Sequence, residues 1–195
     1  MEQKENSAFN LSSLLKTYFG DERILSIAKF LEEKKNVSIK GIAGSSLSFI
    51  ASAVAKNKPG IHLIILQDKE QAAYLLNDLE TLTSPLNSLS SSKGEKETGF
   101  FKREVLFFPS SLKKPFQFEE NDSSSIQLRA EVLTKIHSST STPALVAYRQ
   151  SSVLVVSYPE AMAEKVISKK QLEKNSINLS KGEKLSLQFL TDILN

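Results

Sequence analysis

The sequence predicts an α/β fold in which a parallel β-sheet carries helices on its faces. Three apolar runs have the length of buried strands, at residues 61–66, 104–108 and 152–157. Helical patterns separate these runs, so that strands and helices alternate along the chain. This alternation implies right-handed crossovers between parallel strands.

Two amphipathic helices are predicted in an N-terminal segment, residues 1–36, that precedes the sheet. The apolar residues of the first helix share one face, and the helix ends at Gly20: Leu11, Leu14, Leu15, Tyr18 and Phe19. Asp21 can cap the second helix, whose apolar face carries Ile24, Ile27, Ala28 and Leu31. We expect both faces to pack on the protein's own sheet; the alternative is that they dock on another protein.

The predicted α/β domain spans residues 37–158 and begins with a strand at 37–41, where polar and apolar side chains alternate. The helix after this strand has an apolar stripe formed by Leu47, Ile50, Ala51, Val54 and Ala55. The strand at 61–66 is apolar almost throughout, so we expect helices to cover both of its faces. Asp68 and Gln71 then form a variant capping box for a helix that presents Ala72, Leu75, Leu76 and Leu79 to the core.

Polar segments interrupt the second half of this domain. Residues 83–99 are of low complexity and predict a mobile loop, and residues 138–143 predict a second polar linker. The helix between the last two strands begins near Ser123, and its predicted inner face carries Ile126, Ala130, Leu133 and His137. Residues 144–150 fit no pattern clearly.

The C-terminal segment, residues 159–195, is predicted to be the start of a small α+β domain. Pro159 suits the first turn of a helix that leads into residues 161–166. A short strand pattern at 177–179 and a helix pattern at 186–194 follow. The second domain would then be truncated at Asn195.

Composition excludes several classes of protein. The net charge is +3, but lysines alternate with acidic residues, so no stripe dedicated to nucleic acid is evident. Without cysteine there is no disulfide framework or thiol nucleophile, and two histidines, His62 and His137, do not make a metal site. The sequence shows no export signal or membrane span, so we expect a cytoplasmic protein without a membrane partner.

The turn before the helix of residues 47–55 resembles a phosphate loop that has lost its chemistry. A functional loop needs glycines to wrap the anion, a lysine for the β and γ phosphates, and a hydroxyl for magnesium. Against the pattern G-x-x-x-x-G-K-[ST], serine replaces the second glycine and leucine replaces the lysine. Losing one charge-assisted contact to phosphate costs about 1.5 to 3 kcal/mol. We therefore expect no ATP, cofactor or metal at these positions: Gly41, Gly44, Ser45, Ser46, Leu47 and Ser48.

No catalytic residue is predicted elsewhere. No strand is followed directly by an acidic magnesium ligand, because Glu160 lies too far beyond residues 152–157. The acidic run at residues 119–122 is better explained as solvated or helix-capping than as an acid/base pair.

The order of these motifs resembles the N-terminal region of the bacterial transcription-repair coupling factor. The resemblance runs from about residue 37 to the end. It rests on the Gly41–Ser48 turn, the capped strand before Asp68, and these later motifs: Val105–Pro109, Pro115-Phe116, Arg129, Leu133, Leu154–Ser157, Ile177–Leu179 and Lys181–Glu183. It implies a RecA-like domain that is degenerate for ATP, followed by a small domain that binds the excinuclease protein UvrA. In that family, RNA polymerase, DNA and the ATP-driven motor belong to regions outside these 195 residues.

Two departures limit what the resemblance implies. The excinuclease helicase that is similar to this family clamps DNA with a tyrosine-rich hairpin, whereas residues 109–119 are short and contain no tyrosine. The family's contacts with UvrA lie mainly beyond Asn195, so no contact residue is assigned.

The leading hypothesis is a non-catalytic module that helps recruit UvrA, and with it the excision repair machinery, to stalled RNA polymerase. One alternative is a nucleotide-dependent DNA helicase domain that binds ATP through a divergent loop. Another is an α/β interaction domain with no role in repair.

Overall fold

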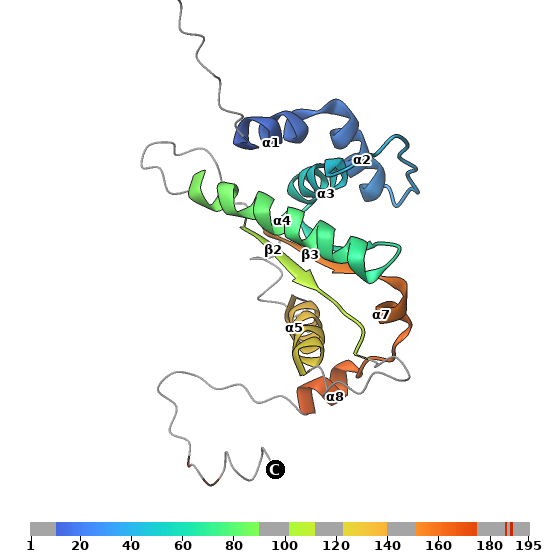
Figure 1. Ribbon diagram of the computed structural model, residues 1–195, viewed down its shortest axis with the longest axis vertical. Helices are drawn as coiled ribbons and strands as arrows, with labels where there is room; N and C mark the ends of the chain where they lie inside the picture. Colours follow the sequence, from blue (N-terminus) through green and yellow to red (C-terminus); the bar gives the residue numbers. More distant parts are fainter. Residues whose placement is uncertain are drawn as a thin grey trace, which may run out of the picture. The chain divides into compact units, whose positions relative to one another are not determined.

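The computed structural model describes residues 11–89, 102–111, 123–139 and 151–174, with two isolated positions near the C-terminus. The chain divides into two compact units, residues 1–165 and 166–195. All strands of the described ranges lie in the first unit, where helices flank a small sheet (Figure 1). The first unit holds the candidate site.

The sheet confirms the predicted parallel α/β arrangement. Its strands are β1 (Gly60–Ile65), β2 (Lys102–Phe107) and β3 (Ser151–Ser157), in the order β1-β3-β2, and both neighbouring pairs are parallel. Each strand lies within two residues of its predicted position. The central strand β3 is buried from Ser152 onward and supplies Val153 through Val156 to the main core.

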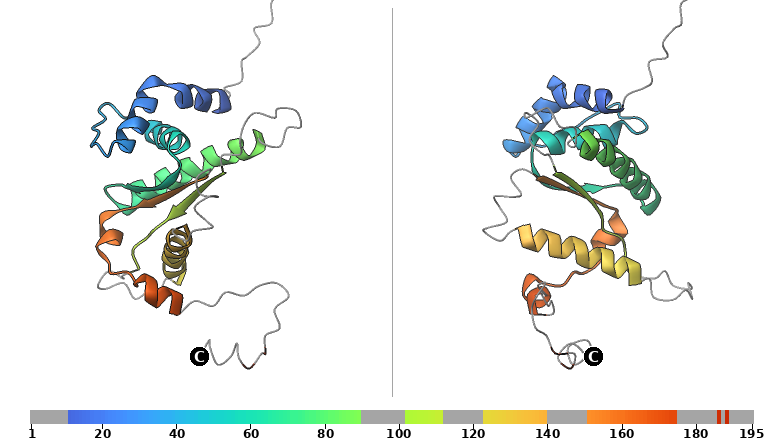
Figure 2. Two further views of the ribbon diagram at one scale, coloured as in Figure 1. Left: turned by 180° about the vertical axis from the view of Figure 1, so that it is seen from behind. Right: turned by 90° about the vertical axis from the view of Figure 1, so that its left-hand side faces the viewer.

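Helices cover the two faces of the sheet unequally. On one face lie α3 (Ser46–Asn57) and α4 (Lys69–Leu89), and the Ser152 hydroxyl donates to the carbonyl oxygen of Ala55 in α3 at 2.6 Å. On the other face lies α5 (Ser123–Ser139), whose Lys135 forms an ion pair of 2.8 Å with Glu104 of β2. Figure 2 shows α4 and α5 on opposite sides of the strands. Because α4 and α5 lie on opposite faces and connect strands in opposite directions across the sheet, the two connections have the same handedness, as the rule for parallel strands requires.

The prediction that helices cover both faces of β1 is wrong. On the α5 face, the side chains of Ile61, Leu63 and Ile65 remain 42%, 50% and 53% exposed. Their in-register neighbours on β3, Val153 and Val155, are buried. The reason is that β1 is the edge strand, while α5 packs against β2 at the opposite edge.

The N-terminal helices form a separate layer. These are α1 (Leu11–Gly20) and α2 (Glu22–Glu32), and they pack within the protein as predicted, but on α3 and α4 rather than on the sheet. A second core cluster joins these layers: Leu15, Phe19, Ile24, Ala53, Val54 and Leu82. Since α3 lies between this cluster and the main core, its buried positions are small residues such as Ser52 and Ala55.

Two predicted helix caps are confirmed. The Asp21 carboxylate accepts from the backbone N–H of Arg23 at 2.8 Å, and the Arg23 side chain lowers the Asp21 pKa to about 2. The Asp68 carboxylate accepts from the backbone N–H of Gln71 at 2.8 Å and from its side-chain amide at 3.1 Å. Each carboxylate satisfies a donor that the first turn of a helix leaves without a partner.

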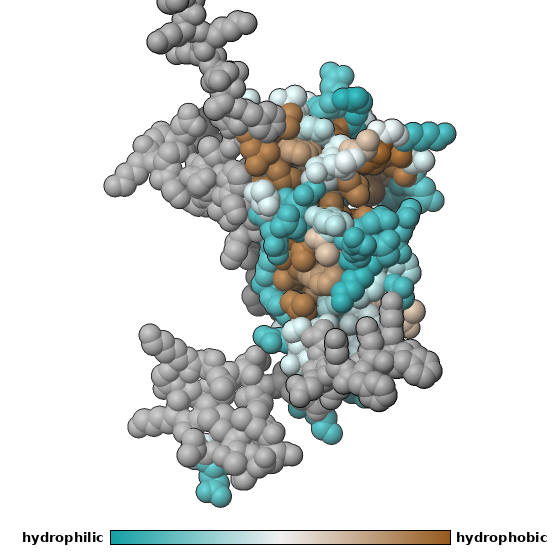
Figure 3. Space-filling view, viewed as in Figure 1, coloured by the Kyte–Doolittle hydropathy of each residue, from teal (hydrophilic) through white to brown (hydrophobic). Residues whose placement is uncertain are grey.

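The predicted strand at 37–41 is absent from the structure. Residues 35–43 adopt neither helix nor strand, and the apolar side chains of Val37, Ile39 and Ile42 are exposed. On the face drawn in Figure 3, hydrophobic side chains show around α1 to α3 and again below α4. Alternation alone does not make a strand, because a strand needs a neighbour to bond its backbone.

Two predicted polar segments begin as helix. The predicted loop 83–99 starts inside α4, which continues to Leu89, and the predicted linker 138–143 starts inside α5, which ends at Ser139. Extending a formed helix by one residue costs far less than nucleating one, so polar composition does not stop it at once. The remainder of both segments lies outside the described residues, as does the unassigned segment 144–150.

The inner face of α5 is offset by one residue from the prediction. Ile126 is 56% exposed and Ala130 is exposed, whereas Ser125, Arg129 and Val132 are buried. The prediction was wrong at Ile126 and Ala130, whereas Leu133 packs partly buried against the main core as expected. The prediction did not include Arg129 in the inner face of α5, whereas the structure buries its polar side chain there.

A helix that starts at a proline follows β3, as predicted. Pro159 lies in the first turn of α7 (Pro159–Ala163), which is shorter than the expected 161–166 extension and buries Ala161 in the main core. Although the sequence assigned residues 159–165 to the second domain, they belong to the first compact unit. In the second unit, α8 (Lys169–Lys174) starts at a capping box formed by Ser168 and Gln171. The strand pattern at 177–179 lies outside the described residues.

The uneven coverage of the sheet predicts a large difference between two leucines on neighbouring strands. Leu154→Ala, at a fully buried position, should lower the free energy of unfolding by about 3 kcal/mol because it leaves a cavity. Leu63→Ala should cost about 1 kcal/mol or less, since half of its side chain is already in water. Urea unfolding of both variants measures the difference. Equal losses would show that the α5 face of β1 is covered after all.

Candidate functional site at the carboxyl edge of the sheet

The carboxyl ends of the strands are the first place to look for a site. In open parallel sheets, ligands bind outside these ends, where successive connections leave toward opposite faces. Here the chain leaves β1 toward α4 and leaves β2 toward α5, with β3 between them. The candidate position is therefore the carboxyl edge around β2 and β3.

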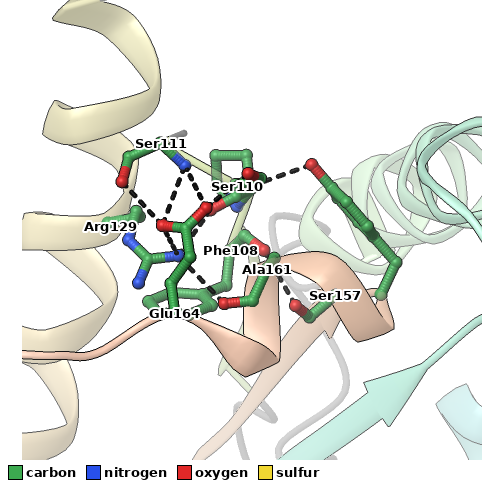
Figure 4. A network of polar contacts seen from close by, with 9 residues as sticks. Phe108, Ser110, Ser111, Arg129, Ser157, Ala161 and Glu164 are labelled. Atoms are coloured by element: carbon green, nitrogen blue, oxygen red, sulfur yellow. Dashed lines mark hydrogen bonds and ion pairs between the residues drawn. The ribbon is translucent and has the colours of Figure 1, made fainter. Parts of the chain in front are cut away.

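Side chains and backbone already occupy this position (Figure 4). The backbone N–H of Phe108 donates to the Val156 carbonyl oxygen at 2.9 Å, and the Ser157 hydroxyl donates to the Phe108 carbonyl oxygen at 2.8 Å. The Tyr158 hydroxyl accepts from the backbone N–H of Ser110 at 2.9 Å. These bonds hold the segment after β2 against the segment after β3.

Arg129 of α5 places a buried positive charge in this region. Its side chain is only 8% exposed, and Nη1 donates to the carbonyl oxygens of Pro109 at 2.8 Å and Ala161 at 3.2 Å. The guanidinium carbon lies 4.1 Å from the centroid of the Phe108 ring, within range of a cation–π interaction. The arginine thus joins α5, the segment after β2, and α7.

Glu164 supplies the matching negative charge. Its side chain is 5% exposed, and Oε2 lies 3.3 Å from Arg129 Nη1. The carboxylate accepts from the Ser111 backbone N–H at 2.9 Å and 3.1 Å, from the Ser111 hydroxyl at 2.6 Å, and from the Ser110 hydroxyl. Buried charges persist when they are paired and hydrogen-bonded, and both conditions hold here.

The phosphate-loop turn is closed by its own hydroxyl groups. The Ser46 hydroxyl donates to the Ala43 carbonyl oxygen at 2.6 Å and accepts from the Ala43 backbone N–H at 3.1 Å. The buried Ser48 hydroxyl, at the position of the magnesium ligand, donates to the Ser45 carbonyl oxygen at 2.6 Å. Both hydroxyls therefore already have partners within the turn.

Leu47, at the position of the missing lysine, packs against the main core. Because residues 35–43 form no strand, the turn also does not follow directly from a strand, as a phosphate loop does. Two glycines nevertheless keep the geometry of such loops: Gly41 and Gly44 have φ angles of 80° and 53°. Those left-handed angles suit glycine, since side chains rarely adopt them.

The other titratable residues do not converge on a common point. Within the described ranges, no group of three or more histidines, cysteines or acids is placed to hold a metal ion. Nε2 of His62 lies 2.7 Å from the Lys58 carbonyl oxygen, and Glu160 is exposed on α7. The acidic run 119–122 lies outside the described residues. No helix in the described part of the chain has both the length and the apolar character that crossing a membrane requires.

Sequence reasoning missed the Arg129–Glu164 pair and its serine partners. Arg129 was noted only as part of a motif order, and Ser110, Ser111, Tyr158 and Glu164 were not singled out. The sequence does contain one indication of the buried arginine. Arg129 lies at helical spacing from Ser125, Val132 and Ile136, so it falls on the same helix face as these residues. An arginine in such a stripe requires an acid, but the stripe alone does not say which.

Comparisons with known proteins add no relative: no family model, curated protein or solved structure matches this chain. The site must therefore be interpreted from its own geometry.

Breaking the buried ion pair should be costly. Arg129→Met should lower the free energy of unfolding by about 3 to 5 kcal/mol, because it leaves the Glu164 carboxylate buried without its counter-charge. Adding Glu164→Gln should restore part of this loss, since the remaining group is neutral. Urea unfolding of both single variants and the double variant measures the coupling. A loss for Arg129→Met below about 0.5 kcal/mol, which is typical of a surface position, would contradict the burial of the pair.

Proposed function

We propose that this chain is a non-catalytic recruitment module built on a RecA-like α/β domain whose phosphate loop has decayed. The observation that carries the proposal is the closed Gly41–Ser48 turn, in which Leu47 packs against the core and the flanking hydroxyls bond within the turn. The small parallel sheet with flanking helices is consistent with such a domain.

The energetics of the turn favour this proposal over ATP binding. A bound phosphate would have to replace the internal bonds of Ser46 and Ser48, and no lysine would compensate. A hydrogen bond to a charged group contributes about 1.5 to 3 kcal/mol, so the missing lysine alone removes much of the affinity. Hydrolysis suffers further, because lysine and magnesium stabilise the transferred phosphate.

The proposed role follows the resemblance to the N-terminal region of the transcription-repair coupling factor. In that role the module helps bring the excinuclease protein UvrA to stalled RNA polymerase in the cytoplasm. The partner would bind the small domain that begins in the second unit, while RNA polymerase and DNA would contact regions outside this chain. The filled carboxyl edge supports a scaffold role, because α/β enzymes usually place their ligands at that edge.

One observation favours the alternative, a nucleotide-dependent DNA helicase domain with a divergent loop. Gly41 and Gly44 retain the positive φ angles that let backbone N–H groups face an anion. If those N–H groups alone sufficed, the domain would bind nucleotide without the lysine.

Nucleotide binding separates the two proposals. The wild-type chain should show no saturable binding of a fluorescent ATP analogue with magnesium in the micromolar range, whereas Ser46→Gly/Leu47→Lys should gain measurable affinity. Leu47→Met serves as the matched control, since it keeps an apolar side chain of similar volume and adds no charge. Low-micromolar binding by the wild-type chain would overturn the decayed-loop proposal and favour the helicase domain.

Retention of the partner tests the recruitment role. Immobilised chain should retain purified UvrA above the level of a column without the chain. Retention that disappears when residues 166–195 are removed would place the contact in the second unit. Failure of both this chain and a longer one carrying the complete small domain to retain UvrA would instead favour an α/β interaction domain without a repair role.

A further inference from the structure

The buried carboxylate of Glu164 lies where several donors from other elements converge. The hydroxyls of Ser110 and Ser111 and the Ser111 backbone N–H donate to its two oxygens, and Nη1 of Arg129 forms an ion pair with Oε2 at 3.3 Å. We call these three residues the 110/111/129 nest. The serines follow β2 and the arginine belongs to α5, so no donor of the nest comes from the helix that precedes Glu164 (Figure 4).

We propose that the 110/111/129 nest is a binding site for a small oxyanion, a carboxylate or a phosphate, which Glu164 occupies in cis. This inference goes beyond the recruitment role and does not depend on it. The donor set matches the chemistry of such anions: hydroxyls, a backbone N–H and a guanidinium are the groups that bind phosphate and carboxylate in proteins. Its place at the carboxyl edge of a parallel sheet is also where α/β domains bind ligands.

Arg129 and the Ser110 backbone are held in place by contacts that do not involve Glu164, whereas the bonds of Ser111 all go to the Glu164 carboxylate. Nη1 of Arg129 is fixed by the carbonyl oxygens of Pro109 and Ala161, and its guanidinium rests on the Phe108 ring. The Ser110 backbone is fixed by the Tyr158 hydroxyl. Arg129 and Ser110 should therefore keep their positions when the carboxylate is removed, and an external anion would have to order Ser111 again as Glu164 does.

Glu164 lies near the end of the first compact unit. It follows the last residue of α7 and has extended backbone angles, φ −76° and ψ 141°. The helix itself is held by the buried Ala161, and the next residues, Lys165 and Val166, are exposed. The compact unit ends at Lys165, so withdrawing Glu164 does not require the core to open.

The test is anion rescue of Glu164→Ala. The variant should unfold at lower urea concentration than the wild type, and acetate or inorganic phosphate should restore part of its stability. Its apparent affinity for these anions should exceed that of the wild type by at least about tenfold, because no resident carboxylate competes. Sodium chloride at equal ionic strength is the reference for screening.

Two control variants separate a site from a general salt effect. Phosphate stabilises many proteins because it is excluded from their surface. Val132→Ala, which truncates a buried side chain on α5, measures how much stability phosphate restores by this general effect. Glu164→Gln keeps the nest filled with a neutral group and should show no more rescue than Val132→Ala. Arg129→Met/Glu164→Ala should lose the rescue, because the guanidinium is gone.

The outcomes decide the proposal. Rescue specific to Glu164→Ala supports an oxyanion site, and parallel titrations with magnesium-ATP show whether the terminal phosphate of a nucleotide is accepted as well as free phosphate. Equal rescue of Glu164→Ala and Val132→Ala would overturn the proposal and leave a purely structural ion pair. If Glu164→Ala does not fold in chloride, folding in acetate is the supporting result. Failure in every salt, with no anion response from Glu164→Ser, overturns it.

Discussion

The burial of the Arg129 charge is the constraint around which the carboxyl end of the sheet is arranged. A guanidinium cannot leave water without acceptors, so the segment after β2, the start of α7 and the Glu164 carboxylate all turn toward it. The same requirement sets the phase of α5, which places Arg129 inward and leaves Ile126 in solvent. Elements that are distant in sequence are thereby joined at one point.

This arrangement explains why a scaffold role suits the domain. The space that a ligand would fill in a related topology holds an ion pair, a tyrosine hydroxyl and two serines, while the phosphate-loop turn satisfies its own hydroxyls. The described surface does carry exposed apolar side chains. Among them are isoleucine, leucine and valine side chains on the outer face of β1 and along the segment 35–43.

The residue types of the Gly41–Ser48 turn could be interpreted from the sequence, whereas the cluster at the carboxyl edge of the sheet could not be predicted. The sequence shows leucine, not lysine, at position 47, and the apolar stripe that contains Leu47 correctly indicated that it packs against the core, where it is partly buried. The internal bonds of Ser46 and Ser48 are short-range, yet they depend on turn angles that the sequence does not specify. The partner of Arg129 is 35 residues away at Glu164, and no local pattern connects the two.

The sequence by itself determined the three strands and the helix caps at Asp21 and Asp68, because each depends on neighbours within a few residues. Only the tertiary structure decided what covers each element. In the tertiary structure, β1 is an edge strand with one face exposed, and α1 and α2 pack on α3. Residues 37–41 have no neighbouring strand. Local patterns report which side chains favour burial, but burial requires a second surface, and its position is set by long-range packing.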